Sequence, residues 1–502
     1  GSLGEPLYLD VCAALLEKGR ANVKVYGGRY GLGSKEFTPT MVLSVYKNLE
    51  AKEPKNHFTV GIYEDVTNTS LDFSEKFDAA PAGSTSCKFY GLGSDGTVGS
   101  NKNTVKIIGD HTDKYVQAYF FYDSKKSGGI TVSHLRFGDK PIQSEYLIDA
   151  ADFIACHNQA YIKQYDILGD IKEGGTFLLN CEWDTIEQLE AELPASVKRA
   201  LVEKKVNFYV IDATKIAQEL GLGNRTNSVL QSAFFKLAAI IPEEEAIDLM
   251  KKAAKATYGR KGDKIVQMNY DAIDAGAKQV VEIQVPDSWK SCPDEGLFTP
   301  EVKDGRADVV AFVKNIQSKV NSQEGNNLPV SAFVDYADGS TPSGSAEYEK
   351  RGIAVDIPVW KSENCVQCNR CAYVCPHAVI RPVALTEEEL AKAPEGTEAI
   401  DMIGMPGLKF TMTVSAYDCT GCGSCVNVCP GKKGEKALVM ENMEANAGSQ
   451  KAFDFGREIE VKPEVVAKFK PATVKGSQFK QPLLEFSGAC AGCGETPYAK
   501  LV

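Results

Sequence analysis

Short apolar runs and helical stripes alternate through residues 79–287. The apolar and aromatic runs that predict strands are residues 88–90, 116–122, 130–137, 177–181 and 208–211. Apolar positions that recur every three or four residues predict helices over residues 101–108, 185–204, 227–239, 242–258 and 264–285. Because strands that alternate with helices favour a largely parallel, doubly wound sheet, residues 79–287 are expected to form an α/β domain.

A shorter version of the same pattern covers residues 1–78. Residues 22–26 and 57–63 alternate as strands do. Between them, Thr38 is a good N-cap and Pro39 suits the first position of a helix with an apolar stripe. We expect this region to be the C-terminal part of an α/β domain.

Composition divides the rest of the chain. Residues 288–345 are richer in Pro, Asp, Ser and Gly, which predicts a small linking domain. Residues 346–465 hold the densest cysteine motifs, and residues 466–502 carry one further cysteine pair.

Length and charge exclude several classes of protein. At roughly 100–200 residues per domain, 502 residues correspond to about three or four domains. The net charge of −11 argues against a nucleic-acid partner. The longest apolar stretch, residues 233–241, contains Lys236 and stops at Pro242. A membrane span needs about 18 apolar residues, so none is expected.

Cysteine content points to metal chemistry. Ten of the fifteen cysteines occur in Cys-x-x-Cys patterns near the C-terminus. Such clustering is typical of metal ligation in a reducing compartment. Residues 1–10 show neither the basic nor the apolar segment of a secretory signal. We expect a cytoplasmic location, or the matrix of a reducing organelle.

Two segments match Cys-x2-Cys-x2-Cys-x3-Cys-Pro without deviation. Their cysteines are Cys365, Cys368, Cys371 and Cys375, and Cys419, Cys422, Cys425 and Cys429. In this pattern three cysteines hold one 4Fe–4S cluster and the fourth crosses to the other cluster. One cluster is therefore expected on Cys365, Cys368, Cys371 and Cys429, and the other on Cys419, Cys422, Cys425 and Cys375. Zinc is the alternative, but it prefers pairs of cysteines separated by a longer loop.

Two further features accompany these motifs. Residues 381–418 are expected to be an inserted loop or helix, because residues 386–390 are a good helix start. Cys490 and Cys493 complete no site by themselves. They are half of a third cluster, half of a zinc site, or an ordinary thiol pair.

A glycine-rich turn follows the first strand of the α/β domain. Gly91, Gly93 and Gly96 fit Gly-x-Gly-x-x-Gly between a strand and a helix. Glycines there let backbone N–H groups approach a phosphate. The alternative is a tight turn without a ligand.

Basic residues add to this candidate. Asp123 ends the next strand, where a dinucleotide site has an acidic residue, but Lys125 and Lys126 follow. Adjacent lysines favour a phosphorylated ribose, as in NADP or coenzyme A. A second candidate, with Arg225 beside Asn227 at a helix start, offers an anion site or a solvated arginine. His157 is interpreted as a core or capping residue.

Taken together, these segments resemble pyruvate:ferredoxin (flavodoxin) oxidoreductases, the single-chain 2-oxoacid:ferredoxin oxidoreductases. The resemblance rests on both cluster motifs and on residues 4–11, 30–39, 89–99, 348–354 and 487–498. That family converts pyruvate and coenzyme A to acetyl-CoA and carbon dioxide. It uses thiamine diphosphate with magnesium, and electrons leave through three 4Fe–4S clusters to ferredoxin or flavodoxin.

The resemblance implies a role for each region. Residues 346–465 would be a ferredoxin-like α+β domain with two clusters, and residues 466–502 the start of a thiamine diphosphate domain, with Cys490 and Cys493 on the third cluster. Residues 79–287 would be a coenzyme A-contacting domain. Its implied contacts are Gly91, Gly93, Gly96, Thr97, Val98, Asn101, Lys102, Lys125, Arg225 and Asn227.

The chain departs from the family by what it does not contain. It shows no Gly-Asp-Gly thiamine–magnesium motif. It is therefore interpreted as an internal piece that lacks the family's N-terminal domain and its C-terminal thiamine diphosphate domain. This piece alone is not expected to turn over pyruvate, and no catalytic residue is assigned to it. The complete enzyme is expected to be a homodimer that includes the remaining domains or chains. The alternatives are a non-catalytic iron–sulfur electron carrier and an oxidoreductase for another 2-oxoacid.

Overall fold

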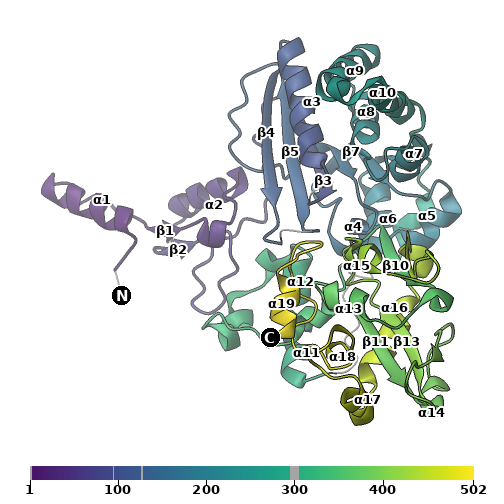
Figure 1. Cartoon of the computed structure of the whole chain (residues 1–502). Coiled ribbons are helices and arrows are strands. Elements are labelled where there is room, and N and C mark those ends of the chain that lie inside the picture. Colours follow the sequence, from purple (N-terminus) through teal and green to yellow (C-terminus); the bar gives the residue numbers. More distant parts are fainter. Residues whose placement is uncertain (1–2, 94, 126–127, 294–304) are drawn as a thin grey trace. The chain divides into compact units, whose positions relative to one another are not determined.

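A computed structural model describes residues 3–93, 95–125, 128–293 and 305–502. These residues form two compact units (Figure 1). The first consists of Gly1–Gly91, Asp95–Tyr122 and Thr131–Pro342, and the second of Leu92–Ser94, Asp123–Ile130 and Ser343–Val502. No described helix is long and apolar enough to cross a membrane.

A seven-stranded sheet forms the centre of the first unit. The order is β4-β5-β3-β6-β7-β8-β9, with bounds β3 Thr85–Leu92, β4 Tyr115–Tyr122, β5 Ile130–Gly138, β6 Ala151–Cys156, β7 Ile171–Asn180, β8 Asn207–Ile211 and β9 Val281–Ile283. Strands β3, β6, β7 and β8 are parallel, whereas β4 is antiparallel to β5 and β9 is antiparallel to β8. The expected α/β class is confirmed, with antiparallel pairs at both edges of the sheet.

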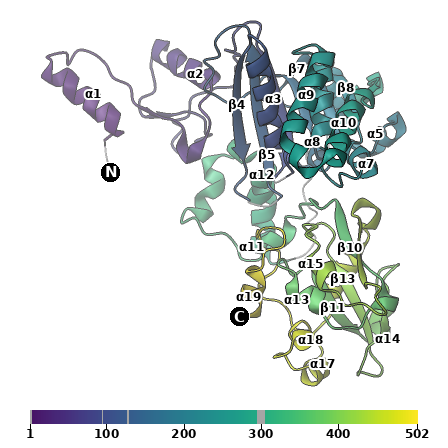
Figure 2. The same cartoon turned by 45° about the horizontal axis from the view of Figure 1, so that its top comes forward.

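One hydrophobic core joins this sheet to its helices, which Figure 2 shows beside the strands. The helices that contribute to it are α3 Thr97–His111, α7 Ala213–Glu219, α8 Asn227–Ala238, α9 Glu243–Tyr258 and α10 Asp263–Lys278. At its centre the ring of Phe234 lies 5.0 Å from that of Phe89 and 5.1 Å from that of Phe153, both edge-on. This packing fixes the carboxyl ends of β3 and β6 relative to α3 and α8.

Two expected helices differ in the structure. The helix expected over 185–204 is divided into α5 Ile186–Glu192 and α6 Ala195–Glu203. Pro194 explains the break, because proline removes a backbone N–H and disfavours helical backbone at Leu193, whose ψ is 133°. The helix expected over 264–285 ends at Lys278, and the alternating residues beyond it form β9.

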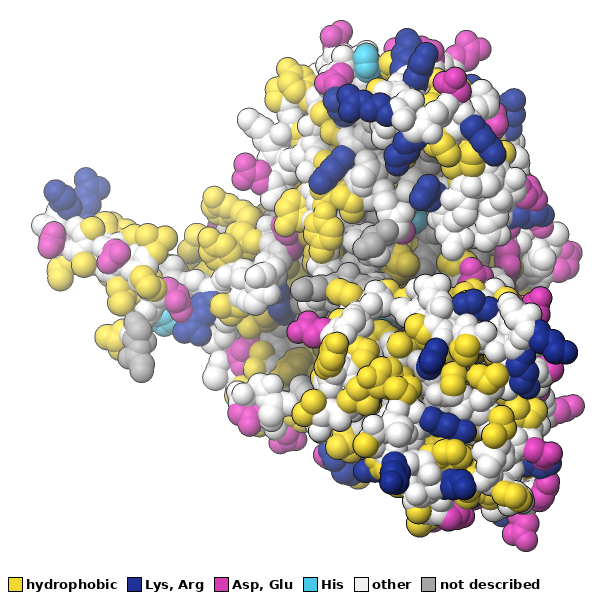
Figure 3. All heavy atoms as spheres, in the orientation of Figure 1, with side chains coloured by type: hydrophobic (Ala, Val, Ile, Leu, Met, Phe, Trp, Pro, Cys, Tyr) yellow, Lys and Arg dark blue, Asp and Glu magenta, His cyan; other side chains and the backbone are white. Residues whose placement is uncertain are grey.

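The N-terminal region of the first unit is only partly as expected. Thr38 caps α2 Pro39–Glu50, but the strand expected at 22–26 is absent from the described residues, and β1 Gly28–Arg29 pairs instead with β2 Phe58–Thr59. Helix α2 buries Thr40, Ser44 and Asn48 and leaves much of its apolar stripe exposed. Figure 3 shows apolar side chains gathered over this region and α1 Pro6–Glu17.

Residues 305–342 belong to the first unit and are mostly helical. They contain α11 Ala307–Phe312 and α12 Ser318–Asn321, joined by a π-helical turn, Val313–Gln317. The N–H of Val330 donates to the carbonyl of Tyr63 at 2.9 Å, so this segment packs on the N-terminal region. Residues 294–304 of the expected linking domain lie outside the described residues.

The second unit is an α+β domain. Its strands are β10 Asp356–Trp360, β11 Ile380–Leu385, β12 Ile400–Asp401, β13 Lys409–Val414 and β14 Leu438–Asn442. They form the antiparallel pair β10-β14 and the sheet β11-β13-β12. Its helices are α13 Arg370–Val374, α14 Glu387–Leu390, α15 Ser424–Val428, α16 Ser449–Glu458, α17 Pro463–Lys468, α18 Val474–Ser477 and α19 Thr496–Leu501. Helix α14 confirms the expected helix start, because Thr386 and Glu389 form a capping box.

Candidate functional site

Four cysteines line a hollow in the second unit. Cys365 and Cys368 lie in the loop before α13, Cys371 lies in the first turn of α13, and Cys429 follows α15. Trp360, Met412 and Leu438 are among the apolar residues that complete the wall. The hollow contains about 330 Å³ of space free of protein atoms, including the part open to solvent.

A second hollow has the same construction. Cys419 and Cys422 lie in the loop before α15, Cys425 lies in the first turn of α15, and Cys375 follows α13. It also contains about 330 Å³ of free space. Each hollow therefore receives three cysteines from one motif and one from the other, which is the grouping that the motif spacing predicts.

The two cysteine loops share an unusual backbone conformation. Gln367 and Asn369 in the first loop, and Gly421 and Gly423 at the matching positions of the second, all have positive φ. This conformation turns the N–H of Gln367 toward Cys365 Sγ and that of Gly421 toward Cys419 Sγ, both at 3.4 Å. Hydrogen bonds to sulfur are one way in which a protein adjusts the reduction potential of an iron–sulfur cluster.

In the first loop the positions with positive φ are not glycines, and hydrogen bonds from their side chains stabilise this backbone conformation. Gln367 is buried, its amide nitrogen donates to the Asp401 carbonyl at 2.8 Å, and its amide oxygen accepts from the Ile403 N–H at 2.8 Å. The Asn369 amide donates to the Lys475 carbonyl at 2.9 Å. The insert and the C-terminal region thus hold the first loop in its left-handed conformation.

The donor set suits an iron–sulfur cluster. Burial raises the pKa values of Cys419 and Cys425 to about 12, so both thiols are neutral at pH 7 until a metal displaces their protons. Within the described residues, no three His, Cys, Asp or Glu side chains are grouped to hold a single ion. The four cysteines of each hollow surround a volume instead.

Cys490 and Cys493 lie beside the second hollow. A Cβ atom placed on Gly492, between them, would be 3.7 Å from Cβ of Cys422 and 3.5 Å from Oγ of Ser424. The Thr496 hydroxyl donates to Cys493 Sγ at 3.2 Å, and this bond lowers the pKa of the Cys493 thiol. Beyond the eight cysteines that line the two hollows, these are the only cysteines of residues 343–502.

The glycine-rich turn is tightly packed at the carboxyl end of β3. A Cβ atom on Gly91 would lie 2.6 Å from Oγ1 of Thr97, and one on Gly96 would lie 2.3 Å from Nδ2 of Asn227. The structure thus brings Gly91, Gly96, Thr97 and Asn227 together. Gly93 lies in the same turn, where its N–H donates to the Gly129 carbonyl at 2.8 Å.

A carboxylate already contacts the start of α3. Asp95 Oδ1 accepts the Thr97 N–H at 2.7 Å, and Asp95 Oδ2 accepts the Thr97 hydroxyl at 2.8 Å. Thr97 also contacts Nδ1 of His157 at 2.8 Å, and burial lowers the pKa of His157 to about 4. His157 is therefore a buried packing residue, as interpreted, whereas sequence reasoning missed the capping role of Asp95.

The remaining candidate residues for coenzyme A binding each have different surroundings. Val98 and Asn101 lie in the first turns of α3, where Asn101 is buried and its Nδ2 has no hydrogen-bond partner in the described structure. Lys102 Nζ lies 5.3 Å from the ring centre of Phe120, and Lys125 Nζ lies 2.8 Å from Glu349 Oε2. Arg225 is exposed. Lys126 is outside the described residues.

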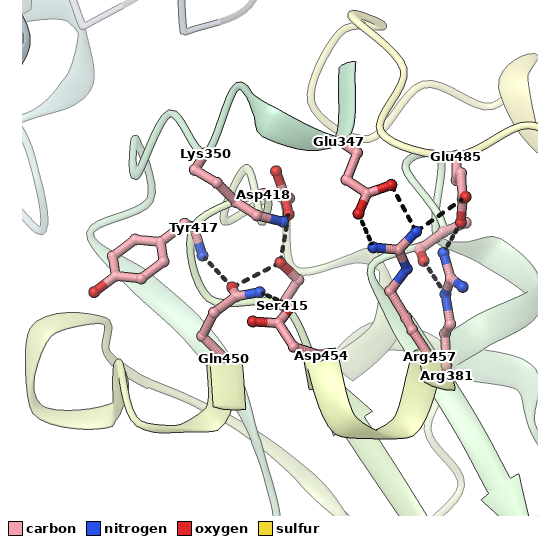
Figure 4. A network of polar contacts seen from close by, with 11 residues as sticks. Glu347, Lys350, Arg381, Ser415, Tyr417, Asp418, Gln450, Asp454, Arg457 and Glu485 are labelled. Atoms are coloured by element: carbon pink, nitrogen blue, oxygen red, sulfur yellow. Dashed lines mark hydrogen bonds and ion pairs between the residues drawn. The ribbon is translucent and has the colours of Figure 1, made fainter. Parts of the chain in front are cut away.

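A network of polar contacts lies in the second unit and includes Asp418, the residue directly before Cys419 (Figure 4). Glu347 accepts two hydrogen bonds from Arg457, at 2.6 and 2.8 Å, and Arg381 pairs with Glu485. The sequence offered no signal for these pairs, because their partners lie more than 100 positions apart.

Three family models match the chain. One described as pyruvate ferredoxin/flavodoxin oxidoreductase matches residues 86–279, and one described as a domain of unknown function matches residues 299–354. A third, described as a 4Fe-4S dicluster domain, matches residues 364–433 and so includes both cysteine motifs.

Relatives that align with the full length of this chain are named as pyruvate oxidoreductases too. The chain is 55% identical over 505 residues to a pyruvate:ferredoxin oxidoreductase of Moorella thermoacetica. It is 51% identical over 503 residues to a pyruvate-flavodoxin oxidoreductase of Enterobacter agglomerans and 48% identical over 503 residues to one of Klebsiella pneumoniae. Each alignment covers 100% of this chain and 42% of the relative.

Proposed function

We propose that this chain supplies the electron-transfer and coenzyme A-contacting part of a pyruvate ferredoxin/flavodoxin oxidoreductase, the kind of enzyme that its relatives and one of its family models name. The chain spans about 42% of the length of these relatives. In the proposed reaction, pyruvate and coenzyme A give acetyl-CoA, carbon dioxide and a proton, and two electrons pass singly to ferredoxin or flavodoxin. Thiamine diphosphate and magnesium belong to the complete enzyme.

The observation that carries this proposal is the pair of four-cysteine hollows in the second unit. A 4Fe–4S cluster in each would carry single electrons. The chain's own residues would ligate the iron, shield it with apolar walls and direct backbone N–H groups at the sulfur atoms. Cys490 and Cys493, beside the second hollow, would supply two ligands of a third cluster. Electrons would then pass from that cluster through the second hollow to the first.

Iron and sulfide analysis tests the cluster assignment. The anaerobically purified chain should contain about eight iron atoms and about eight inorganic sulfides, because two ligand sets are complete and the third is half of one. Inductively coupled plasma mass spectrometry and a colorimetric sulfide assay measure both. Zinc in place of iron, or only about four iron atoms in fully loaded protein, would contradict the assignment.

Binding of coenzyme A is the finer part of the proposal. The support is the glycine-rich turn at the carboxyl end of a parallel strand, where ligands of open α/β sheets bind, and the exposed guanidinium of Arg225 two residues from Asn227. Since Asp95 caps α3, the pyrophosphate would be bound chiefly by side chains such as Arg225.

Arg225→Ala should weaken the binding of coenzyme A by about 10- to 100-fold, the cost of one charge-assisted contact. Isothermal titration calorimetry measures the two dissociation constants. Arg260→Ala, which removes an equally exposed arginine beyond α9, is the matched control and should bind like the wild type. If Arg225→Ala bound coenzyme A as tightly as the wild type, Arg225 would not belong to the site. If neither the wild type nor the variants bound it, the turn would have no ligand role.

A further inference from the structure

An ion pair connects the segment of unknown function to the second cysteine motif. Lys350 belongs to the stretch matched by the model described as a domain of unknown function. Its Nζ lies 2.6 Å from Oδ2 of Asp418, the residue directly before Cys419. The side chains of Lys350 and Asp418 are 18% and 7% exposed, so solvent screens the pair weakly.

The surrounding structure fixes the ammonium group at this point. Lys350 has a φ of +40°, a conformation that residues with a side chain rarely adopt. Its Nζ lies 4.9 Å from the ring centre of Phe486, and the next glycine, Gly352, donates its N–H to the Tyr417 carbonyl at 2.8 Å. Figure 4 shows that the Asp418 carboxylate pairs with the Lys350 ammonium and also accepts a hydrogen bond from the Ser415 hydroxyl at 2.6 Å.

The first cysteine motif lacks this pair. Asn364 precedes Cys365 where Asp418 precedes Cys419, and Asn364 is neutral and half-buried. Its amide nitrogen lies 3.5 Å from the Lys436 carbonyl. The two loops, which have the same cysteine spacing and backbone turns, therefore differ in a buried charge pair next to one ligand.

We propose that Lys350 and Asp418 set the reduction potential of the cluster held by Cys375, Cys419, Cys422 and Cys425. One-electron reduction adds a negative charge to a cluster. The Asp418 carboxylate opposes that charge and the Lys350 ammonium favours it, both from weakly screened positions. Neither residue ligates iron, so both act on the cluster through their charge alone. The proposal rests on the proposed function only in requiring a cluster in the second hollow.

Opposite shifts in the two single variants are the test. In Asp418→Asn the second cluster should be easier to reduce, and in Lys350→Met harder. At a fixed ambient potential the ratio of reduced to oxidised cluster should change by roughly tenfold in each direction, which is a shift of about 59 mV for a one-electron couple. Redox titration of the cluster-loaded chain, followed by electron paramagnetic resonance, measures both clusters.

Three further variants separate electrostatics from structural damage. The double variant should return most of the way to the wild-type potential, and Lys350→Arg, which keeps the charge, should stay close to it. Asn364→Asp adds a carboxylate at the matching position, where the hydrogen bond of the side-chain amide is solvent-exposed, and should shift the first cluster far less. If Lys350→Met loses its iron, the shift in reduction potential measured in Asp418→Asn alone tests the proposal.

Single variants that retain iron but shift together, or do not shift, would overturn the proposal. A wild-type chain without iron would instead contradict the proposed function.

Discussion

Cys429→Ala should reduce the iron content of the chain from about eight to about four atoms, and the lost cluster should be the one held by Cys365, Cys368 and Cys371. The reason is the position of Cys429 in the wall of the first hollow, although its sequence neighbours at 419–425 line the second. Cluster-resolved electron paramagnetic resonance and iron analysis measure the loss.

Two matched variants complete this test. Cys375→Ala should remove the other cluster, held by Cys419, Cys422 and Cys425. Cys292→Ala, which changes a free cysteine outside both hollows, should leave the iron content unchanged. If Cys429→Ala removed the cluster of its own motif instead, the crossed ligation would be wrong.

Phe234→Ala should lower the free energy of unfolding of the first unit by about 3–5 kcal/mol, the usual cost of removing a fully buried aromatic ring. Phe234 is 1% exposed, and its ring contacts those of Phe89, Phe153 and Phe235. The cavity would open between α8 and the sheet. Urea unfolding followed by tryptophan fluorescence measures the effect, since Trp183 and Trp289 both belong to this unit.

Phe77→Ala is the control for that substitution. Phe77 belongs to the same unit but is 49% exposed, so its removal should cost far less. Equal losses for the two variants would mean that the phenylalanine cluster is not the centre of the core.

Structural features that depend only on neighbouring residues could be predicted from local signals in the sequence. The start of α2 at Thr38 and the start of α14 at Thr386 follow from capping chemistry, and both are as expected. The grouping of cysteines could be predicted because the motif spacing itself limits which thiols reach one cluster. The division of the helix at Pro194 was available from the sequence but was outweighed by the helical periodicity around it.

Features that depend on distant partners could not be predicted. The exposure of the apolar stripe of α2 depends on what packs against that helix, not on its own periodicity. Lys125 was expected to remain available to a phosphate, but it pairs with Glu349, which lies 224 positions away. The same limit applies to Lys350 and Asp418, whose pairing is set by the fold of the second unit.

The crossed arrangement of cysteines also determines how the second unit is held together. With both hollows filled, each cluster would join Cys365–Cys375 to Cys419–Cys429 and close a long loop, as a disulfide does. A proteolytic cut in the exposed part of the insert, such as at Lys392, would then leave two fragments that remain attached through metal. The clusters would thus be cross-links as well as electron carriers, and their removal would leave the two halves held only by the strand pairs β10-β14 and β11-β13 and by their shared core.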